Sequence, residues 1–146
     1  KFELSLPGGR ALDAGAAPGG WTKVLADAGM EVTAVDPGAL VNKVTSLPNV
    51  THYPIKLEAF KPEHHFDLLV NDMNVDPADS ARLMVHLAPH LKPNAYAILT
   101  IKLVIRNPHR LLSQTIPILQ EAYAVLRLKH LFHNRREITA LLRRTH

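Results

Sequence analysis

The chain has 146 residues, 47% of them hydrophobic, and a formal net charge of +4, which suits one ordinary domain with a substantial core. It contains no cysteine, so disulfide frameworks, thiolate metal sites and cysteine nucleophiles are excluded. No apolar run approaches the roughly 20 residues of a membrane-spanning helix, so we expect a soluble cytoplasmic protein without a membrane partner, folded as a single domain over residues 1–146.

Short apolar runs alternate with helical segments along the chain. The expected strands are Arg10–Asp13, Glu31–Val35, Asn49–Tyr53, Phe66–Asn71 and Ala95–Ile101. The expected helices are Gly20–Ala28, Ala39–Val44, Pro77–His90 and Pro108–Ala122. Strands such as "FDLLV" and "AYAILTI" are almost entirely apolar, as in a parallel sheet that helices cover on both faces. The pattern predicts a doubly wound, Rossmann-like α/β fold.

The order of elements changes after the last helix. The segments "VLRLKHLFH" and "EITALL" have the pattern of two strands, and the polar turn "NRR" joins them. We therefore expect the mostly parallel sheet to end in a C-terminal antiparallel hairpin.

The stretch "ALDAGAAPGGWT", residues 11–22, places a glycine-rich turn directly after the first strand. In a sheet of this kind the ligand lies beyond the carboxyl ends of the strands. Glycines let the backbone approach such a ligand, and we expect a side chain at Gly19 to occupy ligand space. Gly20 begins a helix whose free N–H groups face the site. A tight turn without a ligand is the alternative.

Asp36 ends the second strand 23 residues after Asp13, where a carboxylate can accept hydrogen bonds from both hydroxyls of a ribose. The sequence "GAAPGG" does not match G-x-G-x-x-G, and no G-K-[ST] follows it, which disfavours dinucleotides and nucleoside triphosphates. Together these features predict a pocket for an adenosine-containing cofactor.

Five segments of the chain occur in the order found in one enzyme family: "LDAGAAPGGWT", "VTAVDPGAL", "FDLLVNDMNVDP", "LKPNAYAILTIKL" and "HNRREITALL". Over essentially its whole length the chain resembles the FtsJ-type (RrmJ-like) RNA ribose 2′-O-methyltransferases. The glycine turn alone is shared by many S-adenosylmethionine enzymes, and the combination is more specific. The resemblance implies a class I methyltransferase that uses S-adenosylmethionine to methylate a ribose 2′-hydroxyl of RNA, with ribosomal RNA as the expected substrate.

Members of this family use a Lys-Asp-Lys-Glu tetrad, and by position the resemblance assigns catalytic roles to Asp72, Lys102 and Glu137. Lys102 is the group expected to take the proton of the hydroxyl. A free lysine has a pKa of about 10.4, which acidic neighbours raise further, so Asp72 and Glu137 are expected to orient the amine and the hydroxyl. As alternatives, Lys102 could be a surface residue, and Glu137 a cross-strand partner of Arg135 or Lys129.

The resemblance and the glycine turn together predict the surroundings of the cofactor. These residues are Asp13, Gly15, Ala16, Pro18, Gly19, Gly20, Trp21, Asp36 and Asp72. The histidine spacings support no metal site, and we expect no bound metal.

Charge is unevenly distributed along the chain. Residues 1–101 hold 8 Lys and Arg against 11 Asp and Glu, a balance of −3, whereas residues 102–146 hold 9 against 2, a balance of +7. A basic segment indicates contact with a polyanion, and a solvated basic surface is the alternative. The residues expected to hold the RNA backbone are Arg106, Arg110, Lys129, Arg135 and Arg136.

Two positions depart from the family pattern. The first lysine of the tetrad belongs to a helix upstream of the first strand, further back than Lys1, so we expect an additional N-terminal segment or an incomplete tetrad. Lys56 stands where the family has an acidic residue near the adenine, and Glu58 is the nearest carboxylate. These departures favour the alternative function, a catalytically impaired RNA-binding module with a methyltransferase fold.

Overall fold

The computed structural model describes residues 8–103, 107–130 and 137–145. The strands are β1 (Arg10–Ala14), β2 (Glu31–Val35), β3 (Val50–Tyr53), β4 (Phe66–Asn71), β5 (Leu91–Lys102), β6 (Tyr123–His130) and β7 (Glu137–Arg144). The helices are α1 (Gly20–Asp27), α2 (Asn42–Thr45), α3 (Pro77–Leu87) and α4 (Pro108–Leu119), with two short 3-10 turns, η1 (Leu57–Ala59) and η2 (Ala88–His90).

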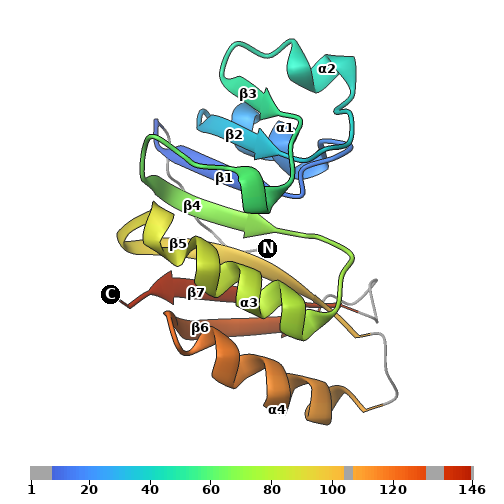
Figure 1. The fold of residues 1–146 in the computed structure, drawn as a ribbon, viewed down its shortest axis with the longest axis vertical. Helices are drawn as coiled ribbons and strands as arrows, with labels where there is room; N and C mark the ends of the chain where they lie inside the picture. Colours follow the sequence, from blue (N-terminus) through green and yellow to red (C-terminus); the bar gives the residue numbers. More distant parts are fainter. Residues whose placement is uncertain (1–7, 104–106, 131–136, 146) are drawn as a thin grey trace.

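Within these residues, seven strands form one sheet in the order β3-β2-β1-β4-β5-β7-β6 (Figure 1). Strands β1 to β5 are parallel, and β7 is antiparallel to both of its neighbours, β5 and β6. The predicted doubly wound sheet with a terminal antiparallel pair is therefore confirmed. The turn expected at residues 134–136 lies outside the described residues.

Helices cover both faces of the sheet. Leu12 and Leu69 are fully buried in a core shared with α3 and α4, whereas Ala11 and Leu68 belong to a second core with α1. Figure 1 shows α3 and α4 lying together across the half of the sheet that contains β5, β7 and β6. Because successive residues of a strand point to opposite faces, burial on both faces explains the uninterrupted apolar runs.

Two helices differ from their predicted bounds because backbone N–H groups there are bonded elsewhere or absent. Residues 39–41 are not helical, because Val41 is extended and its N–H donates to the carbonyl of Pro18 at 3.0 Å. The helix therefore begins at Asn42. The helix predicted over residues 77–90 changes to a 3-10 turn after Leu87, where Pro89 supplies no N–H for the next hydrogen bond.

Two other predicted ends also shift. The strand predicted from Ala95 begins at Leu91, because Leu91 pairs with Phe66 before the register slips at the exposed residues 92–94. The last helix ends at Leu119, and β6 begins four residues later at Tyr123. The hydroxyl of this buried tyrosine donates to the carbonyl of Met84 at 2.7 Å, which fastens β6 to α3. No helix in the described ranges is long and apolar enough to cross a membrane.

Candidate functional site

The turn after β1 is packed against the loop that follows β4. Gly15 has a φ of 71°, and a Cβ on this residue would overlap the side chain of Met73. Its N–H donates to the carbonyl of Val35 at 2.9 Å, so the turn is also held to the end of β2. The backbone conformation and the position of Met73 therefore require a glycine at position 15, whether or not a ligand binds.

The two glycines at the start of α1 have different roles. Gly19 has a φ of 123°, and a Cβ there would lie 3.2 Å from a methyl group of Val44. A side chain at Gly19 would therefore first meet α2, and the expectation that it would also fill ligand space stays a prediction. A Cβ on Gly20 would meet no atom within 4 Å, and Gly20 lines the cavity described below. Gly20 is the glycine that keeps this space open.

Asp36 follows β2 and organises the backbone around it. One of its carboxylate oxygens accepts a hydrogen bond from the N–H of Ala17 at 3.0 Å, and the other accepts from the N–H of Gly38 at 2.7 Å. A carboxylate has about four acceptor sites, so two remain for a ligand. Asp36 thus joins the end of β2 to the glycine turn.

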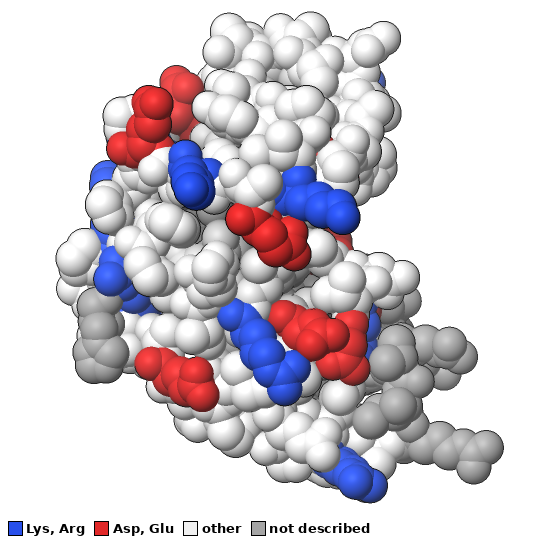
Figure 2. Space-filling view, in the orientation of Figure 1, with Lys and Arg blue, Asp and Glu red and all other residues white. Residues whose placement is uncertain are grey.

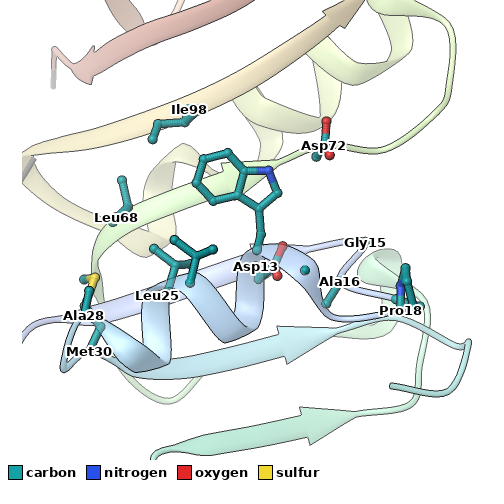
Figure 3. A pocket seen from close by; sticks show the side chains of 14 residues that line it. Asp13, Gly15, Ala16, Pro18, Leu25, Ala28, Met30, Leu68, Asp72 and Ile98 are labelled. Carbon is teal, nitrogen blue, oxygen red and sulfur yellow. The ribbon is translucent and has the colours of Figure 1, made fainter. Parts of the chain in front are cut away.

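A cavity of about 600 Å³ opens beside this turn, between α1 and the face formed by β4 and β5. Figure 3 shows Asp13, Gly15, Pro18 and Asp72 at one end. The other end is apolar, with Leu25, Ala28 and Met30 on one side and Leu68 and Ile98 across from them (Figure 3). The cavity therefore combines a polar end near the ends of the strands with an apolar end over the sheet.

Most residues that were expected to surround a cofactor line this cavity. They are Asp13, Gly15, Ala16, Pro18, Gly20, Trp21 and Asp72. Gly19 and Asp36 do not line it. Lys56 and Glu58, at the position that departs from the family pattern, are exposed and also lie outside it.

Asp13 is a buried carboxyl group at the polar end of the cavity. Its side chain accepts a hydrogen bond from the hydroxyl of Thr22 on α1 at 2.6 Å, and the residue is only 1% exposed. Burial raises the pKa of Asp13 to about 6, against the lowering effect of the Thr22 hydrogen bond. The ionised form is therefore costly in this environment.

Lys102, Asp72 and Glu137 form one cluster at the ends of β5, β4 and β7. The Lys102 Nζ lies 2.6 Å from an Oε of Glu137 and 3.2 Å from an Oδ of Asp72. The lysine side chain is 14% exposed, compared with 40% for Asp72 and 23% for Glu137. Asp72 also lines the cavity, so the cluster adjoins it.

The environment of Lys102 favours its protonated form. Burial would lower the pKa of the amine, but the hydrogen bond to Glu137 and the charge of Asp72 outweigh it, and the net effect raises the pKa. In this arrangement Lys102 is an ammonium group that donates to two carboxylates.

The strand register places Glu137 directly opposite Lys102 in the β5–β7 ladder, and Thr139 directly opposite Lys129. The salt bridge to Lys102 agrees with the catalytic interpretation of Glu137. The alternative pairing with Lys129, two residues from the direct ladder partner, stays open. Arg135, the other alternative partner, lies outside the described residues.

Two of the residues expected to hold RNA fall within the described ranges. Arg110 is exposed in the first turn of α4, and Lys129 lies on β6, the edge strand. Arg106, Arg135 and Arg136 lie outside the described residues. On the face drawn in Figure 2, acidic and basic side chains lie among one another, so this face presents no continuous basic surface.

Sequence reasoning missed three kinds of residue at the site. Met73 fixes the glycine turn, Thr22 holds Asp13, and an apolar wall that includes Leu25 and Ile98 forms half of the cavity. Thr22 carried a weak signal, because it is a polar residue in the first turn of an amphipathic helix. The contacts of Met73 and of the apolar wall join segments that are distant in the sequence, so no local sequence pattern predicts them.

Sequence comparison identifies one family. Residues 1–104 match the FtsJ-like methyltransferase family. A curated protein named "Ribosomal RNA large subunit methyltransferase M", from Halorhodospira halophila, is 37% identical over 142 residues, which cover 97% of this chain and 42% of that protein. The chain spans about two fifths of the length of the curated relatives it matches.

Structure comparison identifies the same kind of fold. Fibrillarin in a complex with Nop5p superposes with a TM-score of 0.80 at 18% identity, covering 98% of this chain and 76% of that one. The N-methyltransferase NodS from Bradyrhizobium japonicum, in complex with S-adenosylhomocysteine, gives a TM-score of 0.72 at 15% identity, covering 96% and 80%. At these identities the comparison shows the fold alone, which is that of Rossmann-like methyltransferases.

Proposed function

The chain belongs to the FtsJ-like methyltransferase family, and we propose that it transfers a methyl group from S-adenosylmethionine to a ribose 2′-hydroxyl of ribosomal RNA. The observation that carries the proposal is the arrangement of Asp72, Lys102 and Glu137 beside a cavity that is lined by the glycine turn, α1 and the ends of β1 and β4. The name shared by the curated relatives supports ribosomal RNA as the substrate.

The residues at the polar end of the cavity suit a cationic nucleoside better than a phosphate-bearing one. Asp13 and Asp72 line this end, Asp36 is hydrogen-bonded to the lining residue Ala17, and all three carboxylates would repel phosphates. Of the cationic side chains that the structure describes, Lys102 adjoins the cavity, and it is already paired with two carboxylates. The open space at Gly20 provides room for the ligand beside the start of α1.

Each part of the site has a role in holding S-adenosylmethionine. Asp36 would accept hydrogen bonds from the ribose hydroxyls with the acceptor sites that Ala17 and Gly38 leave open. The turn from Gly15 to Gly20 would support the methionine part, and Trp21 would flank it. When bound, this cofactor supplies a methyl group activated by its positively charged sulfur.

The lysine cluster would align the acceptor hydroxyl. In the protonated form that its surroundings favour, Lys102 would donate a hydrogen bond to the 2′-oxygen and so position it, whereas neutral Lys102 would take the hydroxyl proton as the oxygen bonds to the methyl group and the methyl–sulfur bond breaks. Asp72 and Glu137 fix the position of the amine, because both hold it at hydrogen-bonding distance. For Lys102 to accept the proton, a nearby cation must first lower its pKa, as the other lysine of the family tetrad would do.

The acceptor is proposed to be bound through its phosphates by the basic part of the chain. Arg110 and Lys129 are the described residues of the predicted set, and Arg106, Arg135 and Arg136 complete it. Electrostatic contact of this type orients RNA without reading its sequence. A ribosomal RNA substrate would place the protein in the cytoplasm.

We further propose that residues 1–146 form one methyltransferase domain and that a preceding segment supplies the first lysine of the tetrad. The length of the curated relatives supports additional chain in proteins of this type. The chain's own described residues supply the other three members, Asp72, Lys102 and Glu137.

The test is methyl transfer from isotope-labelled S-adenosylmethionine to unmodified ribosomal RNA, followed by mapping of 2′-O-methyl positions. Incorporation at one ribose, lost in Lys102→Ala, is the expected result. Cofactor and RNA binding without transfer, even in a protein extended by its natural N-terminal segment, would instead support the RNA-binding module with impaired catalysis.

A further inference from the structure

Strands β5, β7 and β6 form the end of the sheet beyond β4, and one of their two faces lies on the side of the cavity (Figure 1). Ile98 of β5 lines the cavity, and Leu141 of β7 lies directly opposite it. Both pack in the core that contains α1, whereas α3 and α4 pack on the other face. Residues directly opposite each other in an antiparallel ladder point to the same face, so the register identifies the other side chains on the cavity side.

Three cationic side chains lie on this face, which we call the cationic face. Arg127 of β6 is directly opposite Leu141, and Lys129 follows two residues later, opposite Thr139. Arg143 of β7 is two residues beyond Leu141. Because alternate residues of a strand point to the same side of a sheet, all three side chains lie on the cavity side. Arg127 and Arg143 are exposed, and Lys129 is partly buried.

The register also brings the cationic face into line with the lysine cluster. Glu137 and its ladder partner Lys102 lie on the same face, because each is four residues from the pair of Leu141 and Ile98. Counted along β7, the three cationic positions are two, four and six residues from Glu137, which corresponds to steps of about 7 Å. The cations therefore form a row that leads to the cluster.

The charges on these three strands suit a polyanion. Within their bounds Glu137 is the only carboxylate, and it is bound to Lys102 at 2.6 Å. Among the described residues, neither Arg127 nor Arg143 has an ion-pair partner. Cations without acidic neighbours attract phosphates, and regular steps match the repeating charges of a nucleic-acid strand better than the irregular charges of a protein surface.

We propose that an RNA strand lies across the cationic face, with phosphates bound by Arg127, Lys129 and Arg143, and runs along β7 toward Lys102. The inference rests on the proposed function, in which a ribose of this RNA accepts the methyl group. It adds two arginines to the residues that contact RNA and places the approach of the RNA on the cavity side of the sheet. Arg110 belongs to α4, which packs on the opposite face, so it is not part of this surface.

The first experiment measures the affinity for unmodified ribosomal RNA at several salt concentrations, in a protein that includes its natural N-terminal segment. The double variant Arg127→Gln/Arg143→Gln should lower the slope of log K against log salt by about two units, because each phosphate contact contributes about one. Its melting temperature and its affinity for S-adenosylmethionine should stay unchanged, because both side chains are exposed and neither lines the cavity.

The matched control is the double variant Lys43→Gln/Arg82→Gln, which removes the same net charge from two exposed residues of α2 and α3. Its slope should equal that of the wild type. An equal loss of slope in the control would show an effect of net charge alone and contradict the cationic face.

The second experiment locates the RNA. Residues 1–146 contain no cysteine, so Arg127→Cys provides a single attachment site for an iron chelate that cleaves nearby RNA through hydroxyl radicals, once any cysteine outside these residues is replaced by serine. Cleavage within a few nucleotides of the methylated ribose is the expected result. The same chelate on Arg82→Cys, on the opposite face of the sheet, should give no cleavage there.

The outcomes separate this inference from the proposed function. Methylation of ribosomal RNA with an unchanged salt slope in Arg127→Gln/Arg143→Gln contradicts the cationic face and leaves the proposed function intact. Unchanged RNA binding, together with lost binding to vesicles that contain phosphatidylserine, would assign the face to a membrane surface and overturn the inference. Failure of the wild type to bind or methylate ribosomal RNA contradicts the proposed function itself.

Discussion

Lys102 and Glu137 face each other across the β5–β7 ladder, with the Nζ of the lysine 2.6 Å from the Oε of the glutamate. This is the shorter of the two bonds that hold the amine, since the bond to Asp72 is 3.2 Å long. The pairing depends on β7 being antiparallel to β5, which brings the first residue of one strand beside the last residue of the other.

Lys102→Ala should lower the rate of methyl transfer by about 10²-fold or more, the usual effect of removing a positioned proton-transfer group. The affinity for S-adenosylmethionine should change little, because the lysine addresses the acceptor. Single-turnover transfer to saturating RNA, in a protein that includes its natural N-terminal segment, measures the first effect, and calorimetry measures the second. A near-normal rate would identify Lys102 as a surface residue.

Glu137→Gln and Asp72→Asn should each lower the same rate, because each removes a charge that holds the lysine amine. Because Glu137 makes the shorter bond and is less exposed, its substitution should have an effect at least as large as that of Asp72. The double variant should be little slower than either single variant, since the three residues act as a unit. Independent, multiplicative losses would contradict a shared role.

Gly20→Leu should weaken binding of S-adenosylmethionine at least tenfold and leave the melting temperature almost unchanged. The new side chain would enter open space in the cavity, and leucine is a better helix former than glycine. Gly15→Ala is the contrasting variant, because its Cβ would overlap Met73 and the residue has a φ of 71°. It should lower the melting temperature, and calorimetry with thermal denaturation separates the two effects.

Asp13→Asn should stabilise the ligand-free protein at pH 8. The folded-state pKa of about 6 exceeds the ordinary value of 3.8, so the folded state binds more protons and the wild type loses stability as pH rises between these values. The full deficit is reached above pH 6 and corresponds to up to about 3 kcal/mol. Urea unfolding at pH 4.5 and pH 8 should show the advantage of the variant growing with pH, and an advantage independent of pH would exclude this origin.

Arg110→Ala should reduce the salt dependence of RNA binding. If Arg110 contacts a phosphate, its removal lowers the slope of log K against log salt by about one unit. Arg82→Ala is the matched control, because Arg82 is exposed on the neighbouring helix α3 and is paired with Asp79 at 3.0 Å. Equal slopes for the wild type and both variants would remove Arg110 from the RNA-binding surface.

The sequence predicts those features that depend on local pattern. Apolar runs such as residues 66–71 identify buried strands, and Asp72 and Lys102 stand at strand ends, where the topology brings them together. The contact that a side chain at Gly19 would make with Val44, which is 25 residues away, cannot be predicted from a local pattern. The start of α2 depends likewise on a hydrogen bond from Val41 to Pro18. Such contacts arise only when distant segments pack.

The position of β7 between β5 and β6 also determines when the protein can complete its fold during translation. β5 is synthesised before β6 and β7, and its outer edge has no partner until residues 137–144 have been made. β6 likewise cannot join the sheet before β7. Unpaired edges of this kind promote association between chains, so a nascent protein that stalls after β6 is exposed to aggregation. β7, which covers these edges, also carries Glu137. The pairing of β7 with β5 therefore completes the sheet and the lysine cluster at the same time.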